Sequence, residues 1–140
     1  MRANYSTGAK WEPLVGYSRA VRMGDVIEVS GTVAMKDGAP YGIDDPYQQT
    51  QRILEIIGEA LAYFGASYEH VIRTRMYVTN VDHWEAVGKA HGEVFGDIRP
   101  ATSLVQVSAL IAPEYLVEIE ATAIAPQQSM NLAGAGPLPL

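Results

Sequence analysis

Two runs of alternating side chains, residues 102–109 and 116–123, limit the possible folds more than any other feature of this sequence. In the second run the odd-numbered positions are apolar, and the even-numbered positions include Glu118 and Glu120. A period of two residues is typical of a strand with one buried face. A turn signal at 112–114 separates the runs. We therefore expect two half-buried strands, with the glutamates either wetted by solvent or held at the mouth of a site.

The rest of the chain predicts a hairpin followed by a helix, a strand and a second helix. The expected elements are a hairpin of residues 16–22 and 26–32, a helix over 45–65, a strand over 71–79 and a helix over 83–95. The first helix has the clearest signals, because Asp45 is a good N-cap, Pro46 suits the first helical position and Gly65 suits the end. Two helices against one mixed sheet make an α+β two-layer sandwich.

A two-layer sandwich leaves one face of its sheet uncovered. By the alternation of side chains, this face carries Glu118, Glu120, Arg73 and Arg75 together with apolar groups. A mixed face of this kind often marks a subunit interface.

Composition favours one globular domain. The chain has 140 residues, of which 48% are hydrophobic, which is enough for one sizeable core. We expect residues 1–126 to form this domain and the Gly/Pro-rich residues 127–140 to form a flexible tail. No apolar run approaches the ~20 residues of a membrane span, and the N-terminus lacks the pattern of a secretion signal. The expected location is therefore the cytoplasm, without membrane contact.

The residue types exclude several kinds of site. The absence of cysteine excludes disulfides, thiol nucleophiles and Cys-zinc sites. The three histidines lack metal-ligand spacing, so we expect no metal. The net charge of −6 opposes a surface that follows phosphates. Two features stay open: residues 30–32 (SGT) either bind an anion through backbone N–H groups or form a bend, and Tyr17 either lines a cleft or packs.

The last two runs carry a resemblance to a known family. Residues 99–105 (RPATSLV) and 116–121 (LVEIEA) resemble the Rid family, the reactive-intermediate deaminases also called YjgF-like or L-PSP proteins. Residues 16–18 (GYS), residues 27–32 (IEVSGT) and Phe95 support the match, which spans roughly residues 8–125.

The resemblance implies a chorismate-mutase-like homotrimer, with helices outside, sheets in a central barrel and three clefts between subunits. Active members hydrolyse imines made by pyridoxal-phosphate enzymes, such as 2-aminoacrylate, to 2-keto acids and ammonia, and they need no cofactor. An arginine clamps the substrate carboxylate, backbone N–H groups assist, and a glutamate orients the attacking water. By position, Glu118 matches this glutamate and Tyr17 the cleft tyrosine. Ser30 and Gly31 match the backbone-contact loop, and Leu104 the backbone groups of the penultimate strand.

The sequence departs from the family pattern at two positions. Thr102 stands where the family has its arginine, and Gly88 stands where an asparagine is common. Threonine cannot make the bidentate, charge-assisted pair that arginine makes with a carboxylate. Such a bond contributes roughly 1.5–3 kcal/mol, or about 10- to 150-fold in binding. The resemblance therefore points to a subgroup lacking the deaminase arginine, with weak activity on 2-aminoacrylate. Arg99 lies nearby in the sequence, and it replaces that arginine only if it reaches the cleft.

Three functions are consistent with these observations. The leading one is a homotrimer whose clefts bind or hydrolyse a small imine, enamine or carbonyl metabolite, which either has no carboxylate or is held by a different clamp. The alternatives are a non-catalytic ligand-binding or regulatory protein and an L-PSP-type endoribonuclease, which the acidic composition disfavours.

The spacing of the two glutamates gives a further expectation. Residues two apart on a strand face the same side, so Glu118 and Glu120 repel each other. We expect Glu118 to be the more buried and the more readily protonated, with Tyr17 and Gly31 nearby. Glu120 is then satisfied by a positive or hydrogen-bonding partner, and the candidates are Arg73 and Arg75.

Overall fold

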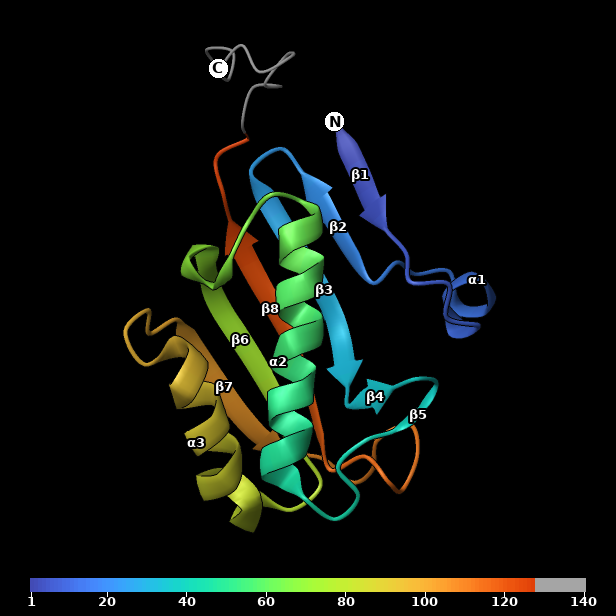
Figure 1. The fold of residues 1–140 in the computed structure, drawn as a ribbon, viewed down its shortest axis with the longest axis vertical. Coiled ribbons are helices and arrows are strands. Elements are labelled where there is room, and N and C mark those ends of the chain that lie inside the picture. Colours follow the sequence, from blue (N-terminus) through green and yellow to red (C-terminus); the bar gives the residue numbers. More distant parts are fainter. Residues whose placement is uncertain (128–140) are drawn as a thin grey trace.

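The computed structural model describes residues 1–127 and shows a six-stranded sheet (Figure 1). Its order is β1-β2-β3-β8-β6-β7. The strands are β1 (Arg2–Tyr5), β2 (Ala20–Met23), β3 (Val26–Val33), β6 (Val71–Val78), β7 (Ala101–Gln106) and β8 (Val117–Ile124). Strands β6 and β7 run parallel, and the other described pairs in this sheet run antiparallel. The expected mixed sheet is therefore confirmed, and β8 lies inside it, between β3 and β6.

Two long helices cover one face of this sheet. Helix α2 (Pro46–Tyr63) and helix α3 (Trp84–Phe95) lie side by side on the same face in Figure 1, while the short helix α1 (Trp11–Val15) stands apart from it. Two 3-10 turns, η1 (Tyr68–His70) and η2 (Val81–His83), precede β6 and α3. A small hairpin of β4 (Met35–Lys36) and β5 (Ala39–Pro40) follows β3. This confirms the expected α+β architecture with one uncovered sheet face.

The core lies between α2 and the central strands. Ile53, Ile57 and Leu61 of α2 are fully buried, as are Val117 and Ile119 of β8. Burying one such side chain contributes roughly 1.5–3 kcal/mol. The alternation of β8 is therefore explained by the helix layer, which covers its odd-numbered positions.

The ends of α2 follow the predicted signals. The Asp45 side chain accepts a hydrogen bond from the backbone N–H of Gln48 at 3.0 Å. At the other end Gly65 has a φ of 76°, and the N–H of Ala66 donates to the carbonyl of Leu61. This is the Schellman arrangement, in which a left-handed residue closes the last turn.

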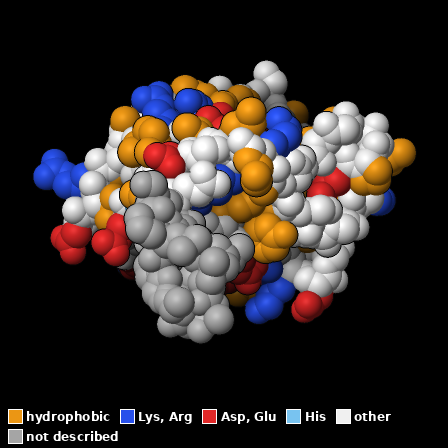
Figure 2. Space-filling view, turned by 90° about the horizontal axis from the view of Figure 1, so that it is seen from above, with side chains coloured by type: hydrophobic (Ala, Val, Ile, Leu, Met, Phe, Trp, Pro, Cys, Tyr) orange, Lys and Arg blue, Asp and Glu red, His pale blue; other side chains and the backbone are white. Residues whose placement is uncertain are grey.

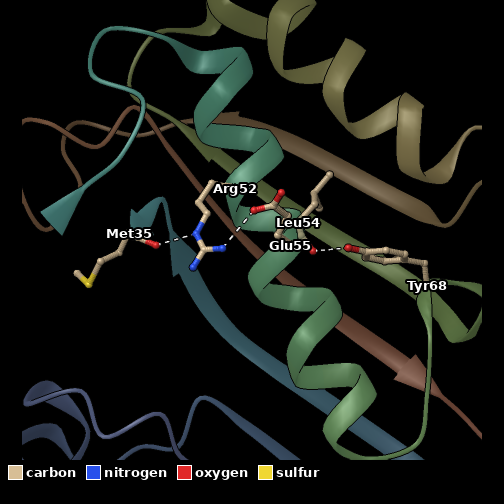
Figure 3. A network of polar contacts seen from close by, with 5 residues as sticks. All are labelled: Met35, Arg52, Leu54, Glu55 and Tyr68. Atoms are coloured by element: carbon tan, nitrogen blue, oxygen red, sulfur yellow. Dashed lines mark hydrogen bonds and ion pairs between the residues drawn. The ribbon is translucent and has the colours of Figure 1, made fainter. Parts of the chain in front are cut away.

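Polar contacts fix α2 to its neighbours (Figure 3). Arg52 Nε donates to the carbonyl of Met35 at 2.9 Å, which ties the helix to β4. Tyr68 Oη donates to the carbonyl of Leu54 at 2.6 Å, which ties it to η1. A Cβ at Gly58 would collide with the Tyr68 hydroxyl. The glycine inside this helix therefore makes room for the tyrosine.

Residues 1–13 contribute β1 and part of α1. The Asn80 side chain accepts a hydrogen bond from the Asp82 N–H and caps η2. One boundary differs from the sequence-based expectation, because strand β7 ends at Gln106, three residues before the expected end at 109. The predicted flexible tail, residues 127–140, lies outside the described residues except for Gln127.

No helix within residues 1–127 is both long enough and apolar enough to cross a membrane.

Candidate functional site

The uncovered face of the sheet carries the two glutamates of β8, as predicted. Glu120 Oε1 lies 3.7 Å from Arg75 Nε and accepts a hydrogen bond from Tyr77 Oη at 3.1 Å. Arg73 turns elsewhere and donates through Nη2 to Ser103 Oγ at 2.8 Å. The expectation that an arginine of β6 satisfies Glu120 is therefore confirmed, and the arginine is Arg75.

Glu118, unlike Glu120, has no hydrogen bond or ion pair among residues 1–127. Burial is the main cause of its raised pKa, and the neighbouring charge of Glu120 raises this pKa further. Arg19 acts in the opposite direction, but the net pKa lies above the ordinary value. Among the described residues, no hydrogen bond to this carboxylate offsets these effects. Glu118 thus holds a proton more readily than an exposed glutamate does, as the spacing on the strand predicted.

Gly31 packs directly against this carboxylate. The pairing of β3 with β8 shifts register between Val29 and Thr32, so Ser30 and Gly31 form a bulge opposite β8. A Cβ at Gly31 would collide with Glu118 Oε2. The Ser30 N–H donates to the carbonyl of Arg19 at 3.0 Å, so it is already paired. The register shift is the bulge that one interpretation of residues 30–32 predicted, and Gly31 provides close approach to Glu118.

Arg19 is a functional candidate that the sequence analysis missed. Its Nη2 donates to the carbonyl of Gly31 at 2.5 Å, and its guanidinium lies 5.7 Å from the centre of the Tyr17 ring. Burial lowers its pKa, while Tyr17, Glu12 and Glu118 favour the charged form. Arg19 lies one residue before β2, on the face opposite to the buried Ala20.

A buried carboxylate holds the segment that leads into this arginine. Glu12 is only 5% exposed, and it accepts hydrogen bonds from Ser6 Oγ at 2.6 Å and Thr7 Oγ1 at 2.8 Å. Burial raises the pKa of Glu12, but the hydrogen bonds from Ser6 and Thr7 outweigh this and lower it. The Tyr17 N–H then donates to the carbonyl of Glu12 at 3.0 Å. Glu12 therefore positions Tyr17 beside Arg19.

A broad hollow of about 550 Å³ opens beside the glutamates. Its polar lining comes from Tyr77, Glu118 and Glu120. Its other walls come from the loop after β7, namely Val107, Ala109, Leu110 and Ile111. The hollow therefore places a partly buried carboxylate next to an apolar wall, which suits a small organic ligand. Within residues 1–127, no three His, Cys, Asp or Glu side chains stand close enough to hold a metal ion.

Thr102 and Leu104 lie on the other face of the sheet. Thr102 Oγ1 is 2.8 Å from Thr74 Oγ1, which in turn is 2.9 Å from His91 Nε2 of α3. Burial lowers the pKa of this histidine. Leu104 packs against the helix-covered core. Within one chain the predicted site residues therefore divide into two groups, with Tyr17, Ser30, Gly31 and Glu118 apart from Thr102 and Leu104.

Known proteins resemble this chain over most of its length. A family model described as Endoribonuclease L-PSP matches residues 7–125. The crystal structure of Rv2704 from Mycobacterium tuberculosis, described as a member of the YjgF/YER057c/UK114 family, has a TM-score of 0.82 and 46% identity and covers 89% of this chain and 100% of that one. The uncharacterized protein SCO2049 of Streptomyces coelicolor is 42% identical over 84% of this chain and 87% of its own. The 3-aminoacrylate deaminase RutC of Acinetobacter baylyi is 29% identical over 79% of this chain and 88% of RutC. The matched region contains β8 and the hollow beside Glu118.

Proposed function

Because the chain belongs to the endoribonuclease L-PSP family, also called the Rid or YjgF family, we propose that its Glu118 hollow binds and hydrolyses a small imine, enamine or carbonyl metabolite. One observation carries this proposal. Glu118 is a partly buried carboxylate with a raised pKa and no hydrogen-bond donor among the described residues, and it borders an apolar-walled hollow. A carboxylate of this kind accepts and returns a proton near neutral pH more easily than an ordinary glutamate.

The proposed reaction needs one water and no redox step. Glu118 orients a water in the hollow and takes one of its protons as the oxygen attacks the C=N carbon. Glu118 passes this proton to the imine nitrogen, which gives a tetrahedral intermediate with one hydroxyl and one amino group. Glu118 then takes the hydroxyl proton and returns it to the nitrogen as the C–N bond breaks, so that ammonia leaves and a carbonyl remains. The other groups of the site position this glutamate: Gly31 allows its close approach, and Glu120 raises its proton affinity.

The division of the site residues supports a homotrimer with sites between subunits. Thr102 and Leu104 cannot meet Glu118 within one chain, because they lie on opposite faces of the sheet. Contact with the edge strand β7 of a second chain would bring the two groups together. The uncovered face also exposes large apolar side chains that a partner would bury, namely Met23, Val26, Val105 and Ile124. Light scattering tests this assembly, and a monomer at micromolar concentration would contradict it.

The endoribonuclease alternative has less support. Figure 2 shows acidic and basic side chains scattered among hydrophobic and uncharged ones on one end of the molecule, without a continuous basic stripe. With a net charge of −6, the surface is poorly suited to follow an RNA backbone. The non-catalytic alternative uses the same hollow. A wild type that binds a ligand without turnover, and a Glu118→Gln variant that no longer binds it, would identify this alternative.

The decisive experiment compares Glu118→Gln with Glu28→Gln. Glu28 lies on the same sheet and accepts a hydrogen bond from Thr122, so it is a matched carboxylate away from the hollow. Imines and enamines are generated in situ, and ammonia release and competition with semicarbazide are measured. We expect Glu118→Gln to lower turnover by about 10²-fold or more and Glu28→Gln to leave it intact. Equal turnover in wild type and Glu118→Gln would refute the mechanism.

A further inference from the structure

We propose that Tyr77 is a specificity-determining residue of the Glu118 hollow, which thereby selects ligands with an N–H group over isosteric ligands with only a carbonyl. This selectivity rests on the proposed function and narrows its ligand to the nitrogen-bearing imine or enamine. Tyr77 lines the same hollow as Glu118 and Glu120. The direction of its hydrogen bond decides what the hollow can offer to a ligand.

The strand register places Tyr77 beside both glutamates. Tyr77 of β6 pairs with Glu118 of β8, and Arg75 pairs with Glu120. Because alternate residues of a strand share a face, all four side chains lie on the uncovered face of the sheet. Tyr77 thus starts directly across from Glu118, and its hydroxyl reaches diagonally to Glu120 Oε1 at 3.1 Å. One hydroxyl and two carboxylates therefore share one wall of the hollow.

The proton of the Tyr77 hydroxyl is committed to Glu120. Glu120 forms an ion pair with Arg75, and an ionised carboxylate only accepts hydrogen bonds. Tyr77 is therefore the donor in their contact. Burial raises the pKa of Tyr77 and the hydrogen bond to Glu120 raises it further, so the hydroxyl keeps this proton at neutral pH. A hydroxyl has one proton and two lone pairs, so Tyr77 has only lone pairs left for a ligand.

The other side chains of the hollow supply no competing donor. Glu118 accepts hydrogen bonds in the ionised form that the reaction needs. The loop after β7 contributes four apolar side chains, and the N–H of its Val107 already donates to the carbonyl of Val78 at 2.8 Å. Within residues 1–127, no lysine or arginine is among the residues that line the hollow. A ligand N–H therefore finds acceptors here, whereas a ligand carbonyl finds no side-chain donor.

This arrangement separates the substrate of the proposed reaction from its product. An unsubstituted imine or an enamine carries N–H donors, whereas the carbonyl product carries only lone pairs at the same place. Desolvating the acceptors of the hollow without giving them a donor costs free energy. The hollow therefore holds the nitrogen compound and releases the carbonyl compound.

The test compares two neutral isosteres, isobutyramide and methyl isopropyl ketone, which differ only in an NH₂ or a CH₃ group. Dissociation constants are measured by NMR chemical-shift titration at about pH 8, where Glu118 is ionised despite its raised pKa. The proteins are wild type, Tyr77→Phe and Tyr63→Phe. Phenylalanine keeps the ring and removes only the hydroxyl. Tyr63 is the matched control, because it is 61% exposed on α2 and does not line the hollow.

We expect wild type to bind the amide about 10-fold or more tightly than the ketone. Tyr77→Phe should weaken amide binding by about 2- to 10-fold and ketone binding by less than about 2-fold. Tyr63→Phe should bind both probes like wild type. If Tyr77→Phe fails to fold, Glu120→Gln decides, because its amide adds a donor to the hollow and should narrow the preference.

Four results would overturn the proposal: a ketone that binds wild type as tightly as the amide, a wild type that binds neither probe, unchanged amide binding in Tyr77→Phe, and equal weakening of both probes in that variant. The last result is what a purely structural role of the hydroxyl predicts. An unchanged preference in Glu120→Gln would also count against it.

The selectivity and the hydrolase proposal can fail separately. Turnover that depends on Glu118, together with equal binding of amide and ketone, would leave a hydrolase without this selectivity. An amide preference that depends on Tyr77, with no effect of Glu118→Gln on turnover, would leave a donor-selective binding site without this mechanism.

Discussion

Removing the charge of Glu118 should stabilise the protein at neutral pH. Glu118 and Glu120 are two residues apart on β8, so their separation is about 6.5–7 Å. Two unit charges at that distance repel by about 0.6 kcal/mol in water and about 2.4 kcal/mol at an effective dielectric constant of about 20. Arg75 neutralises part of the Glu120 charge, and that pair is itself partly exposed, at 39% and 32% of the side chains. We therefore expect Glu118→Gln to raise the free energy of unfolding by about 0.5–1.5 kcal/mol near pH 8.

The gain must depend on pH with a definite sign. Burial and Glu120 raise the folded pKa of Glu118 above its unfolded value, while Arg19 only partly opposes them. Between these two pKa values the folded state binds more protons than the unfolded state, so wild-type stability falls as pH rises. Below the unfolded pKa, near ~4.3, the side chain is neutral in both states and the glutamine variant has no advantage. The advantage should appear as pH rises through this window and then stay constant.

Urea unfolding at a series of pH values from about 4 to 8 measures this difference, at one protein concentration because any assembly adds its own stability. Glu59→Gln is the control, since Glu59 is exposed on α2 and its replacement should change stability by less than about 0.5 kcal/mol. A Glu118→Gln variant that is less stable than wild type near pH 8, or a gain that is the same near pH 4, would refute the reasoning.

Three further predictions address the site and its scaffold. Gly31→Ala should keep the fold but displace the Glu118 carboxylate, because the new methyl group meets the end of a flexible side chain. Ligand binding should then fall while the urea midpoint moves little. Unchanged ligand binding would contradict the close approach of Gly31 and Glu118. Arg22→Met should lower the free energy of unfolding by about 3–5 kcal/mol, because it leaves the carbonyls of Phe64 and Ala125 without their donor; a loss below about 1 kcal/mol in urea would count against it. Turnover of 2-aminoacrylate, followed by semicarbazide competition, should be weak because Thr102 faces the helices, and rates equal to those of arginine-bearing relatives would contradict this.

The sequence predicted the parts of this molecule that depend on a repeating pattern. Strand β8 alternates without interruption, so the burial of Val117 and the position of Glu118 on the uncovered face could both be predicted. Asp45 and Gly65 likewise marked the ends of α2. Each of these features is encoded by neighbouring residues and one periodicity. The hollow could not be predicted in this way, because its apolar wall is a loop after β7 whose residues follow no repeating pattern.

Arg19 could not be assigned from the pattern of its own strand. Charged residues fall on both faces of β2, because Arg22 is buried at 7% exposure while Arg19 lies on the opposite face. Only the pairing with β3 and the bulge at Gly31 reveal which arginine lies near Glu118. Strand β1 was missed for a related reason, because it lacks apolar alternation and is held by its backbone pairing with β2.

The position of β8 makes the fold depend on the end of the described chain. Its partners β3 and β6 are far earlier in the sequence: Val29 pairs with Ala121, and Thr74 pairs with the same residue from the other side. In the folded sheet β8 separates β1-β2-β3 from β6-β7, so these two groups of strands cannot join before β8 is synthesised. Closing such long loops delays folding. The nascent chain should therefore stay sensitive to protease until β8 has emerged, and Glu118 arrives on the very strand that joins the two halves.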